Sequence, residues 1–152
     1  MIQAAHCTES AKPLQLTVRS GSSQASAGGD LHYVSNIYDH PQYSPNNFDY
    51  DFSILKIFGR IIFNTNQKPI KLPDEDDVTA EGVMVKVFGW GNTQNKDESE
   101  EYLRGVELIT ISHEECEEAY KIYDVKTRHN KICAAHPDRT DGKDACQGDS
   151  VS

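Results

Sequence analysis

Short runs in which apolar and polar side chains alternate recur along most of the chain, beginning with Leu14-Gln15-Leu16-Thr17-Val18-Arg19. Alternation with a period of two is typical of a β-strand that buries one of its faces. Similar runs predict strands at 31–38, 52–58, 83–88, 106–111 and 131–134. Segments rich in Gly, Ser, Pro and Asn, such as 21–29 and 41–47, separate these runs and are typical of turns. Many short strands joined by turns indicate an all-β sandwich or barrel.

One helix is predicted within this β pattern. Ser112, with Glu115 three residues later, forms a capping-box sequence, in which each side chain can satisfy a backbone N–H at the start of a helix. We therefore expect a helix from Ser112 to Tyr123. Farther upstream, the Lys-Leu-Pro segment at 71–73 leads into an acidic loop. It is the best candidate boundary between two halves of the chain, 1–73 and 74–152.

The composition excludes two classes of partner. With 37% hydrophobic and 26% charged residues, the chain has the composition of a soluble globular protein. Its net charge of −9 argues against nucleic acid, because phosphate binding needs clustered Lys and Arg. No run approaches the roughly 18 consecutive apolar residues of a membrane span. The acidic clusters at 74–77 and 97–101 lack the ligand spacing of an EF-hand, so we interpret them as solvated loops and expect no metal or other cofactor.

The cysteines point to disulfide bonds and an oxidising compartment. Their spacing is too wide for a CxxC zinc or redox site, the four residues being Cys7, Cys116, Cys133 and Cys146. Structural disulfides persist in extracellular proteins, so we expect a secreted protein. The first residues, Met-Ile-Gln, offer neither a charged region nor an apolar region of a signal peptide. We interpret this conflict as a sign that the natural N-terminus lies upstream.

Three segments carry candidate chemistry in the order His, Asp, Ser. His6 follows two alanines, Asp51 stands directly before an apolar strand, and Ser150 follows Gly148 and Asp149. Taken singly, each has a plain interpretation as a structural histidine, a turn carboxylate and a common Gly-Asp-Ser turn. Together they form a set for nucleophilic catalysis, because imidazole can remove a hydroxyl proton near neutral pH and a carboxylate can fix its tautomer. The glycine lets backbone N–H groups face a developing oxyanion.

Four motifs place these residues in a wider context: Ala4-Ala5-His6-Cys7, Asp51-Phe52-Ser53-Ile54-Leu55-Lys56, Gly89-Trp90-Gly91 and Asp144-Ala145-Cys146-Gln147-Gly148-Asp149-Ser150. In order and approximate spacing, the chain resembles the chymotrypsin/trypsin family of serine proteases over essentially its whole length. The resemblance implies a chymotrypsin/trypsin-like double antiparallel β-barrel and peptide-bond hydrolysis through an acyl-enzyme. Here the fold would be incomplete, without the first strands of one barrel and the later strands of the other.

The resemblance also implies a role for each residue of the set. His6 matches the general base, Asp51 the carboxylate that orients it, and Ser150 the nucleophile. We prefer Asp51 to Asp49 because the family's aspartate directly precedes the apolar strand. We therefore expect Asp51 within hydrogen-bond reach of His6, with Asp49 facing solvent or another partner. The backbone N–H groups of Gly148 and Ser150 match the oxyanion hole.

Substrate preference and disulfides follow from the same resemblance. Asp144, which alone would be read as a surface turn residue, matches the carboxylate at the base of a pocket for substrate Arg or Lys. Protein or peptide substrates with Arg or Lys, and protease inhibitors, are then the expected partners. Cys116 and Cys133 match a disulfide that spans the loop after the capped helix. Cys7 and Cys146 match half-cystines whose partners lie outside this chain.

The chain departs from the family at both ends. Relatives begin at an Ile-Val-Gly-Gly-like terminus, released by cleavage, whose amino group pairs with an aspartate matching Asp149. They also read Gly-Asp-Ser-Gly-Gly-Pro, whereas Val151 and Ser152 follow Ser150 here. We favour a truncated or mis-spliced gene model over a designed ending, and we expect no turnover from residues 1–152. The alternatives are a non-catalytic protease homologue that acts as a binding or decoy protein, and a gene fragment without function.

Overall fold

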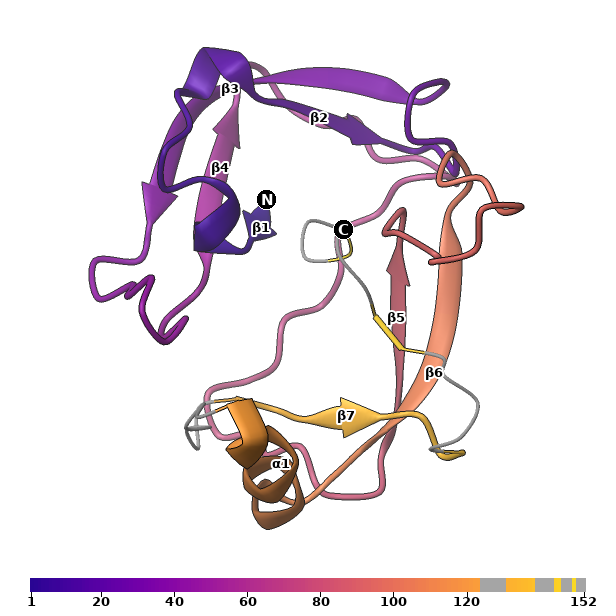
Figure 1. The fold of residues 1–152 in the computed structure, drawn as a ribbon. Coiled ribbons are helices and arrows are strands. Elements are labelled where there is room, and N and C mark those ends of the chain that lie inside the picture. Colours follow the sequence, from indigo (N-terminus) through magenta and orange to yellow (C-terminus); the bar gives the residue numbers. More distant parts are fainter. Residues whose placement is uncertain (124–130, 139–143, 146–148, 150–152) are drawn as a thin grey trace. The chain divides into compact units, whose positions relative to one another are not determined.

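The computed structural model describes residues 1–123, 131–138, 144–145 and 149, which form two compact units. The first unit holds Met1–Lys71 and Gly89–Arg104, together with Asp149. The second unit holds Leu72–Phe88 and the described residues of Gly105–Ala145. Each unit is built on one antiparallel sheet, and helix is scarce (Figure 1). The all-β class predicted from the alternating pattern is confirmed.

The first unit contains a sheet with the strand order β1-β4-β3-β2, in which every neighbouring pair is antiparallel. Its strands are β1 (Ile2–Gln3), β2 (Thr17–Ser20), β3 (Asp30–Asp39) and β4 (Ser53–Ile57). Two single-turn 3-10 helices, η1 (Ala5–Cys7) and η2 (Pro13–Gln15), connect β1 to β2. The register of β3 on β4 shifts between Val34 and Asn36, an irregularity of the kind that bends a strand.

The core of the first unit lies on one face of this sheet. Val18, Val34 and Leu55, one from each of three strands, are buried together. Leu16, Ile37 and Ile57 pack around them. The alternation seen in the sequence explains the arrangement, because Ser53 and Leu55 of β4 are buried while the residues between and after them are exposed. The buried face therefore fixes the orientation of the β4 side chains next to Asp51.

The second unit contains a sheet with the order β5-β6-β7 and the only α-helix among the described residues. Its elements are β5 (Met84–Gly89), β6 (Arg104–Thr110), α1 (His113–Tyr120), η3 (Lys121–Tyr123) and β7 (Ala134–Ala135). Leu108 and Cys116 are its buried apolar residues. None of the helices in the described part of the chain has the length and hydropathy of a membrane-spanning segment.

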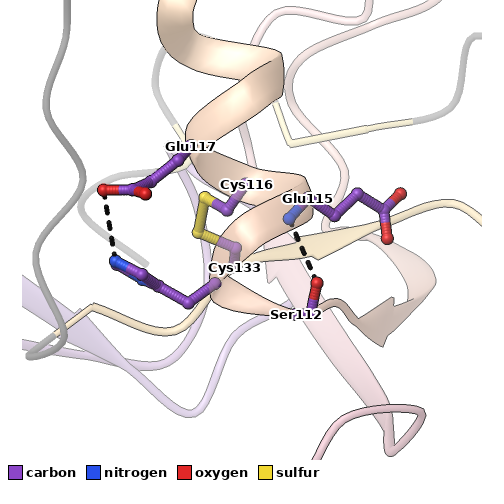
Figure 2. Close-up of a disulfide and its surroundings, with 6 residues drawn as sticks. Ser112, Glu115, Cys116, Glu117 and Cys133 are labelled. Atoms are coloured by element: carbon purple, nitrogen blue, oxygen red, sulfur yellow. Dashed lines mark hydrogen bonds and ion pairs between the residues drawn. A yellow bond between two sulfur atoms is a disulfide. The ribbon is translucent and has the colours of Figure 1, made fainter.

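Helix α1 begins where the capping-box sequence predicts. The Ser112 hydroxyl oxygen accepts a hydrogen bond from the Glu115 backbone N–H at 3.1 Å. One residue later, Cys116 forms a disulfide with Cys133, and the two Cα atoms are 6.2 Å apart (Figure 2). His113 adds an ion-pair contact to Glu117 one turn further along the helix, with Nε2 and Oε1 3.5 Å apart. The predicted disulfide is confirmed, and it ties α1 to the segment that leads into β7.

Three predicted strands are shorter in the structure than in the sequence pattern, and one of them, predicted at 52–58, is β4 at Ser53–Ile57. The run at 14–19 begins as η2 and becomes a strand only at Thr17. Pro13 at the first position of that helix explains the difference, because its fixed φ suits a helical first turn. At the other end of the chain, Ala134 is the only residue of the predicted strand 131–134 that lies in β7, which pairs with β6 and ends at Ala135. The helix predicted to Tyr123 is α-helical to Tyr120 and continues as a single 3-10 turn.

Candidate active site

His6 lies in the middle of η1, directly after the edge strand β1. Ala5 is completely buried, and its carbonyl oxygen accepts from the Thr8 and Glu9 backbone N–H groups at 2.9 Å. The small side chain of Ala5 allows this turn to pack closely against the unit's interior. The turn therefore holds the backbone of His6 in place and leaves its imidazole partly exposed, with 34% of the side chain accessible.

Asp51 lies two residues before β4, after a tight turn with unusual backbone geometry. Phe48 and Tyr50 both have positive φ angles, 51° and 52°. Such angles are uncommon for bulky residues and are found where the surrounding structure enforces them. Asp49, between them, is only 5% exposed. In this turn, Asp49 is therefore buried, and Asp51 lies just before the start of β4.

His6 and Asp51 form a two-point contact. The His6 backbone N–H donates to Asp51 Oδ1 at 2.8 Å, and the ring Nδ1 lies 2.7 Å from Oδ2. An ionised carboxylate can only accept hydrogen bonds, so Nδ1 carries the proton in this pair. The lone pair of the neutral ring is then on Nε2, which is free to accept a proton from a nucleophile. The expected contact between the two side chains is present, and Asp51 rather than Asp49 makes it.

Of the two alternatives expected for Asp49, solvent or another partner, the structure excludes solvent. Its side chain does not face solvent, because the residue is buried. The surrounding loop is tied by two bonds to its backbone: the Asp49 N–H donates to Asn47 Oδ1, and its carbonyl oxygen accepts from the Ser44 N–H, both at 3.1 Å. Asp49 is therefore part of the loop's internal structure.

The carboxylate of Asp51 also influences two neighbouring acidic groups. Burial raises the pKa of the Cys7 thiol above its ordinary value, and the negative charge of Asp51 raises it further. Burial, followed by the charges of Glu9, Asp51 and other nearby groups, raises the pKa of Tyr43 in the same direction. Both groups therefore stay protonated near neutral pH. Cys7 is a free thiol in the structure.

Aromatic side chains pack on His6 and on His40, a feature that sequence analysis missed. The ring of Phe48 meets the imidazole of His6 edge-on, with centroids 5.7 Å apart and planes at 84°. His40 stacks on Tyr50 at 4.7 Å and lies 4.6 Å from the ring of Phe52. Edge-to-face and stacked contacts of this kind favour fixed ring orientations. The alternation of aromatic and acidic residues at 48–52 is the sequence signal that could have revealed this packing.

The residues of the last predicted motif are described only in part. Cys146, Gly148 and Ser150 lie outside the described residues. Asp144 belongs to the second unit, where it is exposed and its carboxylate accepts from the Ala145 N–H at 2.8 Å. These contacts do not test the roles expected for the four residues.

Asp149 contacts the Gly-Trp-Gly motif within the first unit. Its Oδ1 accepts from the Gly91 N–H at 2.8 Å. A Cβ atom added at Gly91 would lie 2.5 Å from the Asp149 carboxyl carbon, so the Asp149 side chain would have to move aside. The second glycine of the motif therefore permits this close approach. Its neighbour Trp90 donates from Nε1 to the Ser23 carbonyl oxygen at 3.2 Å.

Comparisons with known proteins agree with this geometry. Residues 1–150 match the trypsin family. Trypsin 5G1 of Aedes aegypti is 40% identical over 150 residues, which cover 99% of this chain and 55% of that protein. Trypsin, alkaline C of Manduca sexta is 31% identical, with 99% and 58% covered. Among solved structures, the scabies mite inactivated protease paralogue S-D1 matches with a TM-score of 0.79 at 25% identity, over 88% of this chain and 58% of that chain.

These similarities confirm the predicted fold as an incomplete double antiparallel β-barrel of the chymotrypsin type. The chain spans between 55% and 58% of the length of these relatives. Within that span, the matched region includes His6, Asp51 and Ser150.

Proposed function

The chain belongs to the trypsin family of serine proteases, and on that premise we propose that His6, Asp51 and Ser150 form the catalytic triad of a serine endopeptidase. The observation that carries the proposal is the 2.7 Å contact between His6 Nδ1 and Asp51 Oδ2. It leaves Nε2 as the basic nitrogen, which is the atom that a triad histidine must offer to its serine. The order of the three residues along the chain agrees with this assignment.

The proposed reaction proceeds in two stages. The Ser150 hydroxyl attacks the carbonyl carbon of the scissile peptide bond while His6 Nε2 takes its proton. The same nitrogen then donates that proton to the leaving amine, and an acyl-enzyme remains. Water, activated by the same nitrogen, hydrolyses the ester and regenerates the Ser150 hydroxyl. Throughout, Asp51 holds the ring and stabilises the imidazolium, while the N–H groups of Gly148 and Ser150 stabilise the oxyanion.

We further propose that Asp144 gives preference for peptide bonds that follow Arg or Lys. A carboxylate enclosed in a pocket would leave an uncompensated charge unless the substrate supplies a cation. We also propose an extracellular location, because the Cys116–Cys133 disulfide is stable in an oxidising compartment. Protease inhibitors that mimic a basic substrate would bind the same site.

The polypeptide of residues 1–152 is expected to give no turnover by itself. It spans 55% of the length of Trypsin 5G1, and a triad acts only on a substrate that is held against it in a productive geometry. Val151 follows Ser150, where the family resemblance implies a glycine.

The second candidate function is a non-catalytic homologue that binds substrates or inhibitors. It is supported by the structural similarity to a protein named as an inactivated protease paralogue. The presence of His6, Asp51 and Ser150 together favours the enzyme, because a non-catalytic homologue has no need of all three residues.

A chimera separates these two functions. Residues 1–150 of this chain would replace the matching segment of Trypsin 5G1, and cleavage of Arg-amide, Lys-amide and Phe-amide substrates would be measured. We expect cleavage after Arg and Lys that is lost in Ser150→Ala and His6→Ala, and a weakened preference for basic residues in Asp144→Ser. A folded chimera that binds a trypsin inhibitor but cleaves nothing would support the non-catalytic homologue. Cleavage that survives Ser150→Ala would refute the triad.

A further inference from the structure

The hydroxyl group of Thr8 is buried and lies at the centre of a small polar network that ends at the exposed residue Asp39. Thr8 is only 1% exposed, and its Oγ1 lies 2.7 Å from Asp39 Oδ1. The Ser53 hydroxyl oxygen and the Ala5 carbonyl oxygen are each 3.1 Å away. Ser53 is completely buried as well. A buried hydroxyl with three polar neighbours takes part in hydrogen bonding and does not merely fill space in the core.

Each hydroxyl proton of this network has an acceptor. A hydroxyl has one proton to donate and two lone pairs that accept. The Asp39 carboxylate can only accept and is the nearest neighbour of Thr8, so the Thr8 proton belongs to it. The Thr8 oxygen can then accept the proton of Ser53. The chain Ser53, Thr8, Asp39 therefore leaves neither buried hydroxyl without a partner.

The network joins the turn that carries His6 to the sheet. Asp39 is the last residue of β3 and Ser53 the first residue of β4, and the two are opposite each other in the antiparallel register. Thr8 follows His6 by two residues at the C-terminal end of η1. Asp51 precedes Ser53 by two residues on the same strand segment. One hydroxyl group thus bridges the segment that holds His6 to the segment that holds Asp51.

We propose that Thr8 is a positioning residue for the His6–Asp51 pair. Its hydroxyl fixes the position of η1 relative to the paired residues Asp39 and Ser53. In that position, the backbone N–H and the ring of His6 each reach one oxygen of Asp51. Valine has nearly the same shape but would leave the Ser53 hydroxyl and the Asp39 carboxylate without this partner. The link to catalysis rests on the proposed function, whereas the effect on the pair is measurable without turnover.

Amide hydrogen exchange on residues 1–152 tests the proposal. The His6 backbone N–H donates to Asp51 Oδ1, and the Phe58 N–H donates to the Tyr33 carbonyl oxygen at 2.9 Å just beyond the far end of β4. Phe58 therefore serves as an internal reference for general loss of stability. In Thr8→Val we expect exchange at His6 to accelerate about tenfold relative to exchange at Phe58. In Thr8→Ser, which keeps the hydroxyl, the ratio should stay within about twofold of the native ratio.

The resonance of the His6 Nδ1 proton provides a second readout. In the native chain, its bond to a carboxylate should place it far downfield; Thr8→Val should shift it upfield, and Thr8→Ser should restore it. Equal acceleration at His6 and Phe58, or no change at either, would overturn the proposal. If Thr8→Val does not fold, Asp39→Ala is measured against the same criteria, since Asp39 is an exposed residue that the fold does not need for its core.

The outcome is independent of the triad assignment. An inactive chimera with the expected exchange ratio would refute the proposed function and leave the positioning role in place. An active chimera in which Thr8→Val changes neither the exchange ratio nor the proton resonance would refute the positioning role alone.

Discussion

Replacing Asp51 by asparagine changes the contact on which the candidate site depends. In the native pair, one carboxylate oxygen accepts from the His6 backbone N–H and the other from the ring Nδ1. Asparagine offers one acceptor oxygen and one donor NH₂ group, so it can satisfy only one of these two donors. The backbone N–H has no alternative protonation state, and we expect it to keep the oxygen. The NH₂ group then faces Nδ1, and the ring proton moves to Nε2.

The consequence for catalysis should be large and the consequence for folding modest. A proton on Nε2 blocks the nitrogen that must accept from Ser150, and the triad of this family loses about 10⁴-fold in kcat on this change. That loss corresponds to about 5.4 kcal/mol of transition-state stabilisation. For folding, the loss of a charge-assisted hydrogen bond costs about 1.5–3 kcal/mol. The side chains of His6 and Asp51 are 34% and 19% exposed, so we expect the lower end of that range.

Two measurements check this prediction. Nitrogen NMR of the His6 ring in residues 1–152 reports the tautomer directly, and kcat of the trypsin chimera reports the loss of catalysis. The matched control is Asp49→Asn, because Asp49 is two residues away and buried in the same loop. It should leave the His6 tautomer and kcat essentially unchanged. A larger loss of kcat in Asp49→Asn than in Asp51→Asn, or an unchanged tautomer in Asp51→Asn, would show that the acid of the triad is wrongly assigned.

Three further predictions concern stability and reactivity. Val34→Ala, at a completely buried core position, should lower the free energy of unfolding by about 2 kcal/mol in urea denaturation, whereas Leu14→Ala, at a position 79% exposed, should change it by less than about 0.5 kcal/mol. Cys133→Ser, which opens the disulfide across 17 residues, should lower it by about 3 kcal/mol. Because burial and the charge of Asp51 raise the folded-state pKa of Cys7 above its ordinary value of 9.0, folding favours the protonated thiol; this contribution to stability is complete below pH 9.0 and is lost as the pH rises through the folded-state pKa. Alkylation of Cys7, mapped by mass spectrometry, should therefore be slow near neutral pH and faster in Asp51→Asn; equal rates would contradict the influence of Asp51.

Local sequence patterns were sufficient to predict most secondary-structure elements and to identify the family. Period-two alternation located most strands, because a strand with one buried face must alternate its side chains whatever lies beyond it. The capping sequence located the start of α1 at Ser112. Where a local signal competed with the alternation, as at Pro13, the run became a 3-10 turn first. The order of His6, Asp51 and Ser150 identified the family through motifs that are short and contiguous.

The family resemblance favoured Asp51, but the contact itself depended on the tertiary structure. Asp49 and Asp51 have the same chemistry and the same phase in a period-two pattern, so periodicity cannot choose between them. The turn at Phe48 and Tyr50, with its two positive φ angles, buries one carboxylate and presents the other to an imidazole 45 residues away in sequence. The role inferred for Thr8 has the same origin. A threonine after a histidine and a cysteine has no distinctive sequence pattern. Its role can be inferred only from the fold, in which the end of β3 and the start of β4 lie beside its hydroxyl group. The sequence by itself determined which segments form strands and which residue types are available for chemistry, because these depend on neighbours along the chain. The fold decided which aspartate meets His6 and what holds them together, because those contacts join residues that only packing brings within hydrogen-bond distance.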